Sequence, residues 1–121
     1  MCPMSSYSLS EYSGAVQATW ETAGQIYTSA IDPATLKFST PVAAPGKGDN
    51  RKHPVAIHNA NGEMLLSWTE GTGWARGGKV AWQVFDKDGK ATGDKGREDG
   101  VPTWGLLTAM ARPDNSFLLI Y

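Results

Sequence analysis

Two glycine-rich segments, residues 46–53 and 70–78, hold most of the side chains that could bind a ligand. An aromatic ring can stack on a flat molecule such as a sugar, and a guanidinium group can pair with a carboxylate through two parallel hydrogen bonds. Segments that supply both groups suit a carbohydrate or an anion. The alternative is that both loops are merely solvated and that their tryptophan packs on a neighbouring repeat. The candidate ligand-binding residues are Arg51, Lys52, His53, Glu70, Trp74, Arg76 and, directly before a later predicted strand, Trp104.

The sequence contains no complete catalytic set. A Gly-x-Ser-x-Gly elbow, a phosphate-binding loop and a dinucleotide fingerprint are all absent. The single cysteine, Cys2, rules out an internal disulfide and a cysteine-rich zinc site. His53 and His58 are expected on opposite faces of one strand, so they do not form a metal pair. We expect no catalytic residue, no metal and no cofactor, which weighs against an enzyme without deciding the question.

Apolar runs bounded by tight-turn signals predict an all-β chain. Residues 53–57 form one such run, and Asn61-Gly62 predicts a hairpin with a type I′ turn after it. The next run, residues 64–68, is mostly apolar, which indicates a strand buried on both faces. Alternating apolar side chains in residues 79–85 indicate a strand with one apolar face.

The strands recur with a period of roughly 45–55 residues, and about four short strands per repeat are typical of a β-propeller blade. Trp20, Trp68 and Tyr121 fall at the same position of successive copies, which indicates packing between repeats and not ligand binding. The three alignments pair residues 54–68 with 107–121, residues 24–32 with 78–86, and residues 15–21 with 63–69.

We therefore predict one all-β repeat domain, residues 1–121, with about two and a half four-stranded antiparallel units of the β-propeller type. Copy one spans about residues 2–46, copy two about 47–101 and the half copy about 102–121. The alternative fold is a small β-sandwich or barrel. The expected strands are residues 4–9, 15–21, 25–31 and 37–42, then 54–58, 64–69, 79–85 and 92–97, then 106–111 and 117–121.

An array of this kind has two open ends. Each end leaves an unpaired sheet edge and an uncovered apolar face, and such edges pair readily with another chain. We therefore expect the chain to associate with further copies of itself or to pair with the remainder of a longer propeller.

Composition excludes two classes of partner. The formal net charge of −1 argues against a nucleic-acid-binding surface set by bulk charge. No run of about 18 apolar residues is present, so no membrane span is expected. The first ten residues lack the basic start and apolar core of a signal peptide, and the compartment stays undetermined.

Several passages resemble the C-terminal portion of bacterial sialidase-like β-propellers of the BNR repeat type. They include CPMSS, ATWE, IDPATLK, LLSWTEGTGWARGGKVAWQVFDKDGK and the closing RPDNSFLLIY. The resemblance implies a propeller fold. For the wider family it implies glycosidase activity and, often, a secreted or periplasmic location.

Two features depart from true sialidases. The Ser-x-Asp-x-Gly-x-Thr-Trp box is absent, and nothing marks three of the four arginines, Arg51, Arg76, Arg97 and Arg112, as a carboxylate clamp. We therefore predict a non-catalytic propeller-type repeat module that binds carbohydrate or a protein partner at the two loops. The alternatives are a C-terminal fragment of a sialidase-like glycoside hydrolase and a purely structural scaffold.

Overall fold

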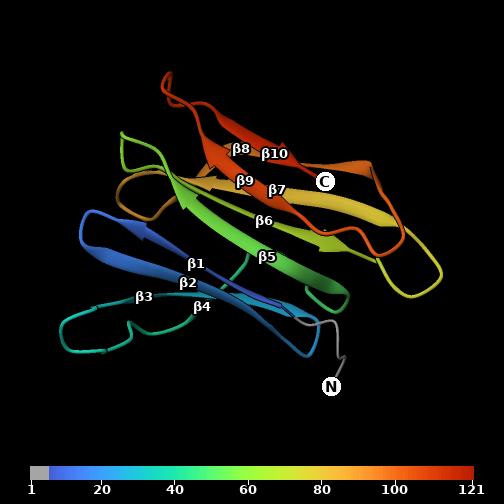
Figure 1. Cartoon of the computed structure of the whole chain (residues 1–121), viewed down its shortest axis with the longest axis horizontal. Coiled ribbons are helices and arrows are strands. Elements are labelled where there is room, and N and C mark those ends of the chain that lie inside the picture. Colours follow the sequence, from blue (N-terminus) through green and yellow to red (C-terminus); the bar gives the residue numbers. More distant parts are fainter. Residues whose placement is uncertain (1–5) are drawn as a thin grey trace.

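The computed structural model describes residues 6–121, which form antiparallel β-sheets (Figure 1). Within these residues there is no helix, and so none that could cross a membrane. The all-β class expected from the sequence is confirmed.

The strands form two four-stranded sheets and one hairpin, and each sheet uses its strands in chain order. The first sheet has the order β1-β2-β3-β4, the second β5-β6-β7-β8, and the third is the β9–β10 hairpin. Consecutive strands pair because short loops can join only antiparallel neighbours. The strands are β1 (Tyr7–Tyr12), β2 (Ala15–Thr22), β3 (Gln25–Ile31), β4 (Val42–Ala43), β5 (Arg51–His58), β6 (Met64–Glu70), β7 (Gly78–Phe85), β8 (Ala91–Val101), β9 (Thr108–Ala111) and β10 (Phe117–Ile120).

Two-residue turns join the first three strands. Ser13 and Gly14 have φ values of 50° and 76°, and Ala23 and Gly24 have values of 52° and 80°. Positive φ at both central residues defines a type I′ turn, whose twist matches that of the flanking strands. These turns keep β1, β2 and β3 in strict register.

The turn at residues 59–62 differs from the expected type I′ turn, so that prediction is wrong. Only Gly62 has a positive φ, 79°, and its N–H donates to the carbonyl of Asn59 at 3.1 Å. The Asn59 side-chain oxygen accepts the N–H groups of Asn61 and Glu63 at 3.0 and 3.1 Å. These bonds stabilise a longer loop in which the glycine takes the last position of the turn.

The fourth strand of the first sheet is also a correction. Strand was expected over residues 37–42, yet β4 covers only two residues, preceded by an isolated bridge between Ile31 and Phe38. Pro41 has no N–H to donate, and Asp32 holds the preceding segment in a turn through the N–H of Ala34 at 2.8 Å. In the second sheet the fourth strand is instead longer than expected, because β8 extends beyond the predicted residues 92–97 at both ends.

The second sheet lies between the other two. Its first strand, β5, contacts β1, β2 and β3 on one side and β9 on the other (Figure 1). The central strand β6 is buried on both faces, as its apolar sequence predicted. The core toward the first sheet contains Ile26, Ala44, Ala56, Leu66, Trp68 and Ala81, and the core toward the hairpin contains Val80, Val101, Leu107, Val55 and Leu119.

Candidate functional site

The two glycine-rich loops lie side by side, as the sequence predicted. The N–H of Gly71 donates to the carbonyl of Asn50 at 3.0 Å, and Arg51 pairs with Glu70 across β5 and β6. Gly78 permits close packing beside them, because a Cβ there would lie 2.1 Å from the carbonyl oxygen of Glu70. The two loops therefore form one surface.

Trp74 and Trp104 meet on this part of the surface. Their ring centroids are 4.2 Å apart with the planes inclined at 79°, an edge-to-face contact, and the residues are 63% and 49% exposed. Trp74 sits in a tight turn closed by the Gly73 N–H and the Arg76 carbonyl at 3.1 Å. Trp104 has a φ of 63°, an outlier for a bulky residue, and this conformation is fixed by the turn before Gly105. Residues from two different repeats thus build one exposed aromatic pair.

A shallow cleft of about 620 Å³ is lined by residues that are close in sequence to the aromatic pair, although neither tryptophan lines it. Arg76 lines it and lies two residues from Trp74, and Val101 lines it three residues before Trp104. Lys79 and Asp99 form an ion pair at 3.0 Å on its wall. The cleft therefore presents both donors and acceptors next to two aromatic rings. Its lining is Asn50, Glu70, Gly71, Arg76, Gly77, Gly78, Lys79, Asp99, Gly100 and Val101.

Arg51 is completely buried and binds groups of the chain itself. Its guanidinium lies 4.6 Å from the ring centre of Trp68, a cation–π contact. Its hydrogen-bond acceptors belong to the first sheet and the segment after it. They are Oε1 of Gln25 at 2.9 Å and the carbonyls of Ala44 and Pro45 at 3.3 and 2.6 Å. The structure places Arg51 as a bridge between the first and second sheets.

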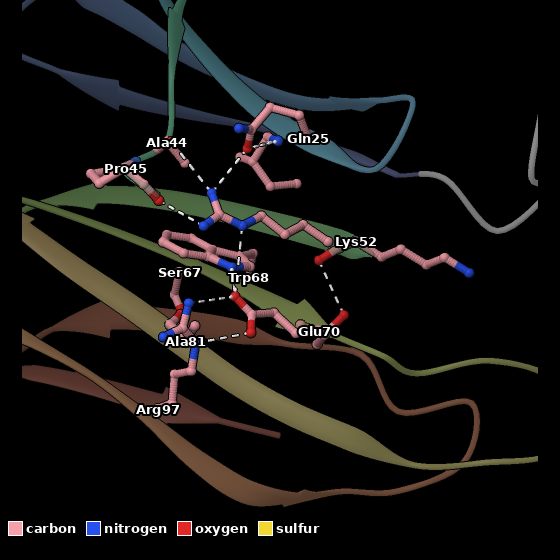
Figure 2. Close-up of polar contacts among 12 residues, drawn as sticks. Gln25, Ala44, Pro45, Lys52, Ser67, Trp68, Glu70, Ala81 and Arg97 are labelled. Atoms are coloured by element: carbon pink, nitrogen blue, oxygen red, sulfur yellow. Dashed lines mark hydrogen bonds and ion pairs between the residues drawn. The ribbon is translucent and has the colours of Figure 1, made fainter. Parts of the chain in front are cut away.

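Glu70 lies at the centre of a polar network with Trp68 and Arg97 (Figure 2) and also pairs with Arg51. Its carboxylate lies 3.6 Å from Nε of Arg51 and accepts hydrogen bonds from Arg97 Nε at 2.9 Å and Trp68 Nε1 at 2.8 Å. Burial raises the pKa of Glu70, but the hydrogen bonds from Arg97 and Trp68 and the charges of both arginines outweigh burial and lower it. Glu70 therefore stays ionised at neutral pH.

His53 and Lys52 do not line the cleft. His53 is 4% exposed, its Nδ1 lies 3.1 Å from the Ser6 hydroxyl, and its Nε2 has no hydrogen-bond partner among the described residues. Burial lowers the pKa of His53, and the charge of Lys52 lowers it further against a smaller opposing effect of Glu21. Lys52 is half-buried, and its carbonyl accepts the Thr69 hydroxyl at 3.1 Å.

The structure thus divides six of the seven predicted site residues into two groups, and the half-buried Lys52 belongs to neither. Glu70, Arg76, Trp74 and Trp104 come together on the surface, whereas Arg51 and His53 are buried between sheets. The sequence analysis missed other residues that the fold adds to this region. Asn50 was recognisable because it precedes Arg51 in the same loop, but the positions of Lys79, Asp99 and Arg97 depend on the pairing of β7 with β8.

The charge of Glu70 limits the chemistry that this residue can perform. An ionised Glu70 can accept hydrogen bonds but cannot act as a general acid at neutral pH. Among residues 6–121, no three His, Cys, Asp or Glu side chains are grouped so that they could hold a metal ion. Exposed rings beside a polar cleft can stack on a ligand and hydrogen-bond its edge.

Comparison with models of known protein families, with curated proteins and with solved structures finds no match to this chain. The functional argument therefore rests on the geometry of the chain itself.

Proposed function

We propose that the chain is a non-catalytic β-propeller-type repeat module that binds carbohydrate at the Trp74–Trp104 pair and the adjoining cleft. Two features of the fold support the propeller assignment. Each four-stranded sheet uses its strands in chain order, and the first strands of successive sheets, β1, β5 and β9, contact one another in series. Blades of a propeller are ordered in this way around a channel.

The aromatic pair carries the proposal for binding. Large exposed apolar side chains in contact are unusual on a surface unless they serve recognition. The pair is built from two loops of different repeats, and Trp104 holds a strained backbone conformation within it. Strain of this kind concentrates at binding sites. A sugar ring offers an apolar face for the tryptophans and hydroxyl groups for the polar cleft.

The exposed guanidinium of Arg76 favours an acidic sugar over a neutral one. Arg76 lines the cleft, and no hydrogen bond or ion pair of its side chain is seen among the described residues. A guanidinium group pairs best with a carboxylate. The proposed ligand class is therefore an oligosaccharide with a carboxylated sugar.

Titration calorimetry with 3′-sialyllactose and lactose tests the proposal. We expect sialyllactose to bind more tightly than lactose, and Arg76→Ala to abolish that preference. Trp74→Ala and Trp104→Ala should each weaken binding about tenfold, equivalent to about 1.4 kcal/mol. Phe38→Ala is the matched control. Phe38 is also a large exposed aromatic residue, at 63%, but it bridges to Ile31 at the C-terminal end of β3, whereas Gln25 is at the N-terminal end of that strand.

Three results would contradict the proposal, and each would favour a different explanation. Binding that is unchanged in Trp74→Ala would remove the tryptophan pair from the site. Binding of neither sugar would favour the structural scaffold. Release of lactose from sialyllactose would favour the sialidase-like hydrolase and would be followed by chromatography of the same samples.

A further inference from the structure

The contact between the first and second sheets shows which two surfaces of neighbouring repeats pack together. The same two kinds of surface occur again, without a packing partner among residues 6–121, at the two ends of the array. On the second sheet, Ala56, Leu66, Trp68 and Ala81 share one face, which we call the Trp68 face. It packs against Ile26 and Ala44, which belong to the first sheet and the segment after it. Trp68 is only 3% exposed as a result. An intact contact of this type therefore buries its tryptophan almost completely.

The first sheet carries an equivalent face with no cover among the described residues. Strand pairing sets Leu9 opposite Ala18 and Trp20 opposite Tyr27, as Ala56 is opposite Leu66 and Trp68 is opposite Ala81. We call this surface the Trp20 face, with the residues Tyr7, Leu9, Ala18, Trp20 and Tyr27.

Its side chains are apolar and partly solvent-exposed. Tyr7 and Leu9 are 79% and 62% exposed, and Trp20 stacks on Tyr27 with ring centroids 6.1 Å apart. Trp20 is more exposed than its buried counterpart Trp68. The face has the composition of an interior surface and lacks the neighbour that Trp68 has.

The opposite end of the chain offers a complementary surface. Strand pairing sets Met110 opposite Leu118 and Thr108 opposite Ile120, so these four side chains share one face of the β9–β10 hairpin. Met110 is 48% and Ile120 54% exposed. We call this surface the hairpin face.

The equivalent surface of the second sheet indicates what the hairpin face should bind. Its equivalents on the second sheet are Val55 and Leu65, since residues 54–68 align with 107–121. Val55 lies in the core with Leu119 and Leu107 of the next unit, and Leu65 adjoins Leu119. The surface equivalent to the hairpin face is thus covered, in the intact contact, by the following repeat.

We propose that the Trp20 face of one copy packs on the hairpin face of a second copy, head to tail. The two faces are the two halves of the contact that already joins successive sheets within the chain. Neither half resembles the other, so a symmetric pairing of two identical faces would not reproduce that contact. Head-to-tail pairing adds further copies, and it gives a ring if the rotation between copies closes and an open filament if it does not. This inference is independent of the sugar site, because neither face includes Trp74 or Trp104.

Light scattering coupled to size exclusion, at micromolar concentration of the full chain, measures the assembly. We expect a mass of two or more times 13.0 kDa. Leu9→Glu and Met110→Glu each place a charge on one face at an exposed position, so each should yield monomers that remain folded. Leu36→Glu is the matched control, since Leu36 is 71% exposed and belongs to neither face; it should assemble like the wild type. Near-ultraviolet circular dichroism verifies that each variant is folded.

Mixing the two charged variants gives the sharpest outcome. Leu9→Glu retains an intact hairpin face and Met110→Glu an intact Trp20 face, so an equimolar mixture should form a dimer and nothing larger. A monomeric wild type, or a Met110→Glu variant that assembles like the wild type, would overturn the proposal. A mixture that stays monomeric would overturn the head-to-tail arrangement.

Discussion

The buried charge of Arg51 gives the most quantitative test of how the sheets are joined. Arg51 is fully buried, and its only carboxylate contact within residues 6–121 is Glu70, at 3.6 Å. Replacing Glu70 with Gln keeps the size of the side chain and the oxygen that accepts from Trp68. It removes the negative charge and, because an amide nitrogen takes the place of Oε2, the exposed hydrogen bond from Arg97 Nε.

The magnitude follows from the separation of the charges. At an effective dielectric constant of about 20, unit charges at this distance attract by about 4–5 kcal/mol. Removing one partner of a buried pair typically costs about 3–5 kcal/mol, because the remaining charge is left without compensation. Three oxygen acceptors still contact the guanidinium, so we expect Glu70→Gln to lower the free energy of unfolding by about 3 kcal/mol.

Arg97→Gln is the matched control. It removes the other arginine bound to Glu70, but the side chain of Arg97 is 56% exposed, so the expected loss is below about 1 kcal/mol. Urea unfolding at one protein concentration, followed by circular dichroism, measures both variants. The difference between them should persist at high salt, because buried charges are weakly screened.

The refuting result is a Glu70→Gln variant that loses no more stability than Arg97→Gln. The carbonyls of Ala44 and Pro45, with Gln25, would then suffice to hold the buried guanidinium. The ion pair would be a minor part of the contact between the sheets.

Two further predictions concern the histidines and the turns. Burial lowers the pKa of His53 and His58 below the ordinary 6.5, so the unfolded chain binds more protons just below that pH. Stability should therefore fall as pH decreases through about 6.5, by at most about 1.4 kcal/mol per pH unit and histidine; urea unfolding across this range would contradict the reasoning if it gave a flat profile. Gly14→Ala should cost about 1 kcal/mol through its positive φ alone, because nothing lies within 4 Å of the added Cβ. Gly24→Ala should cost clearly more in thermal unfolding, because its Cβ would lie 2.4 Å from the carbonyl oxygen of Asp49; equal losses would refute this.

The strand positions follow from local sequence. Turn residues and apolar alternation act over a few neighbouring residues, so the strands at 15–21, 25–31 and 64–69 were predicted to within a residue or two of β2, β3 and β6. The first strand was misplaced, since residues 4–9 were expected, residues 4 and 5 lie outside the described residues and β1 covers Tyr7–Tyr12. Two other failures occurred where side chains decide backbone hydrogen bonding. Asp32 and Pro41 shortened β4, and the side chain of Asn59 changed the type of turn.

The candidate site was only partly accessible from sequence. The adjacency of residues 46–53 and 70–78 followed from the repeat. One segment precedes the first strand of an antiparallel unit and the other follows its second strand, so both lie at the same end of the sheet. The sequence did not indicate which of the two arginines faces solvent. Arg51 and Arg76 both belong to glycine-rich segments of the sequence, yet Arg51 begins β5 and is buried between sheets, whereas Arg76 lines the cleft.

The sequence by itself determined the all-β class, the repeat and the burial of Trp68 between sheets, since these depend on short-range pattern; the equivalent Trp20 and Tyr121 are not buried in this way. Only the tertiary structure decided which side chains from distant repeats meet. Trp74 and Trp104 touch because β7 pairs with β8 and the chain then turns back at residues 102–105. Arg51 is buried because the segment after β4 closes over it. Long-range packing sets both outcomes, and no local pattern encodes them.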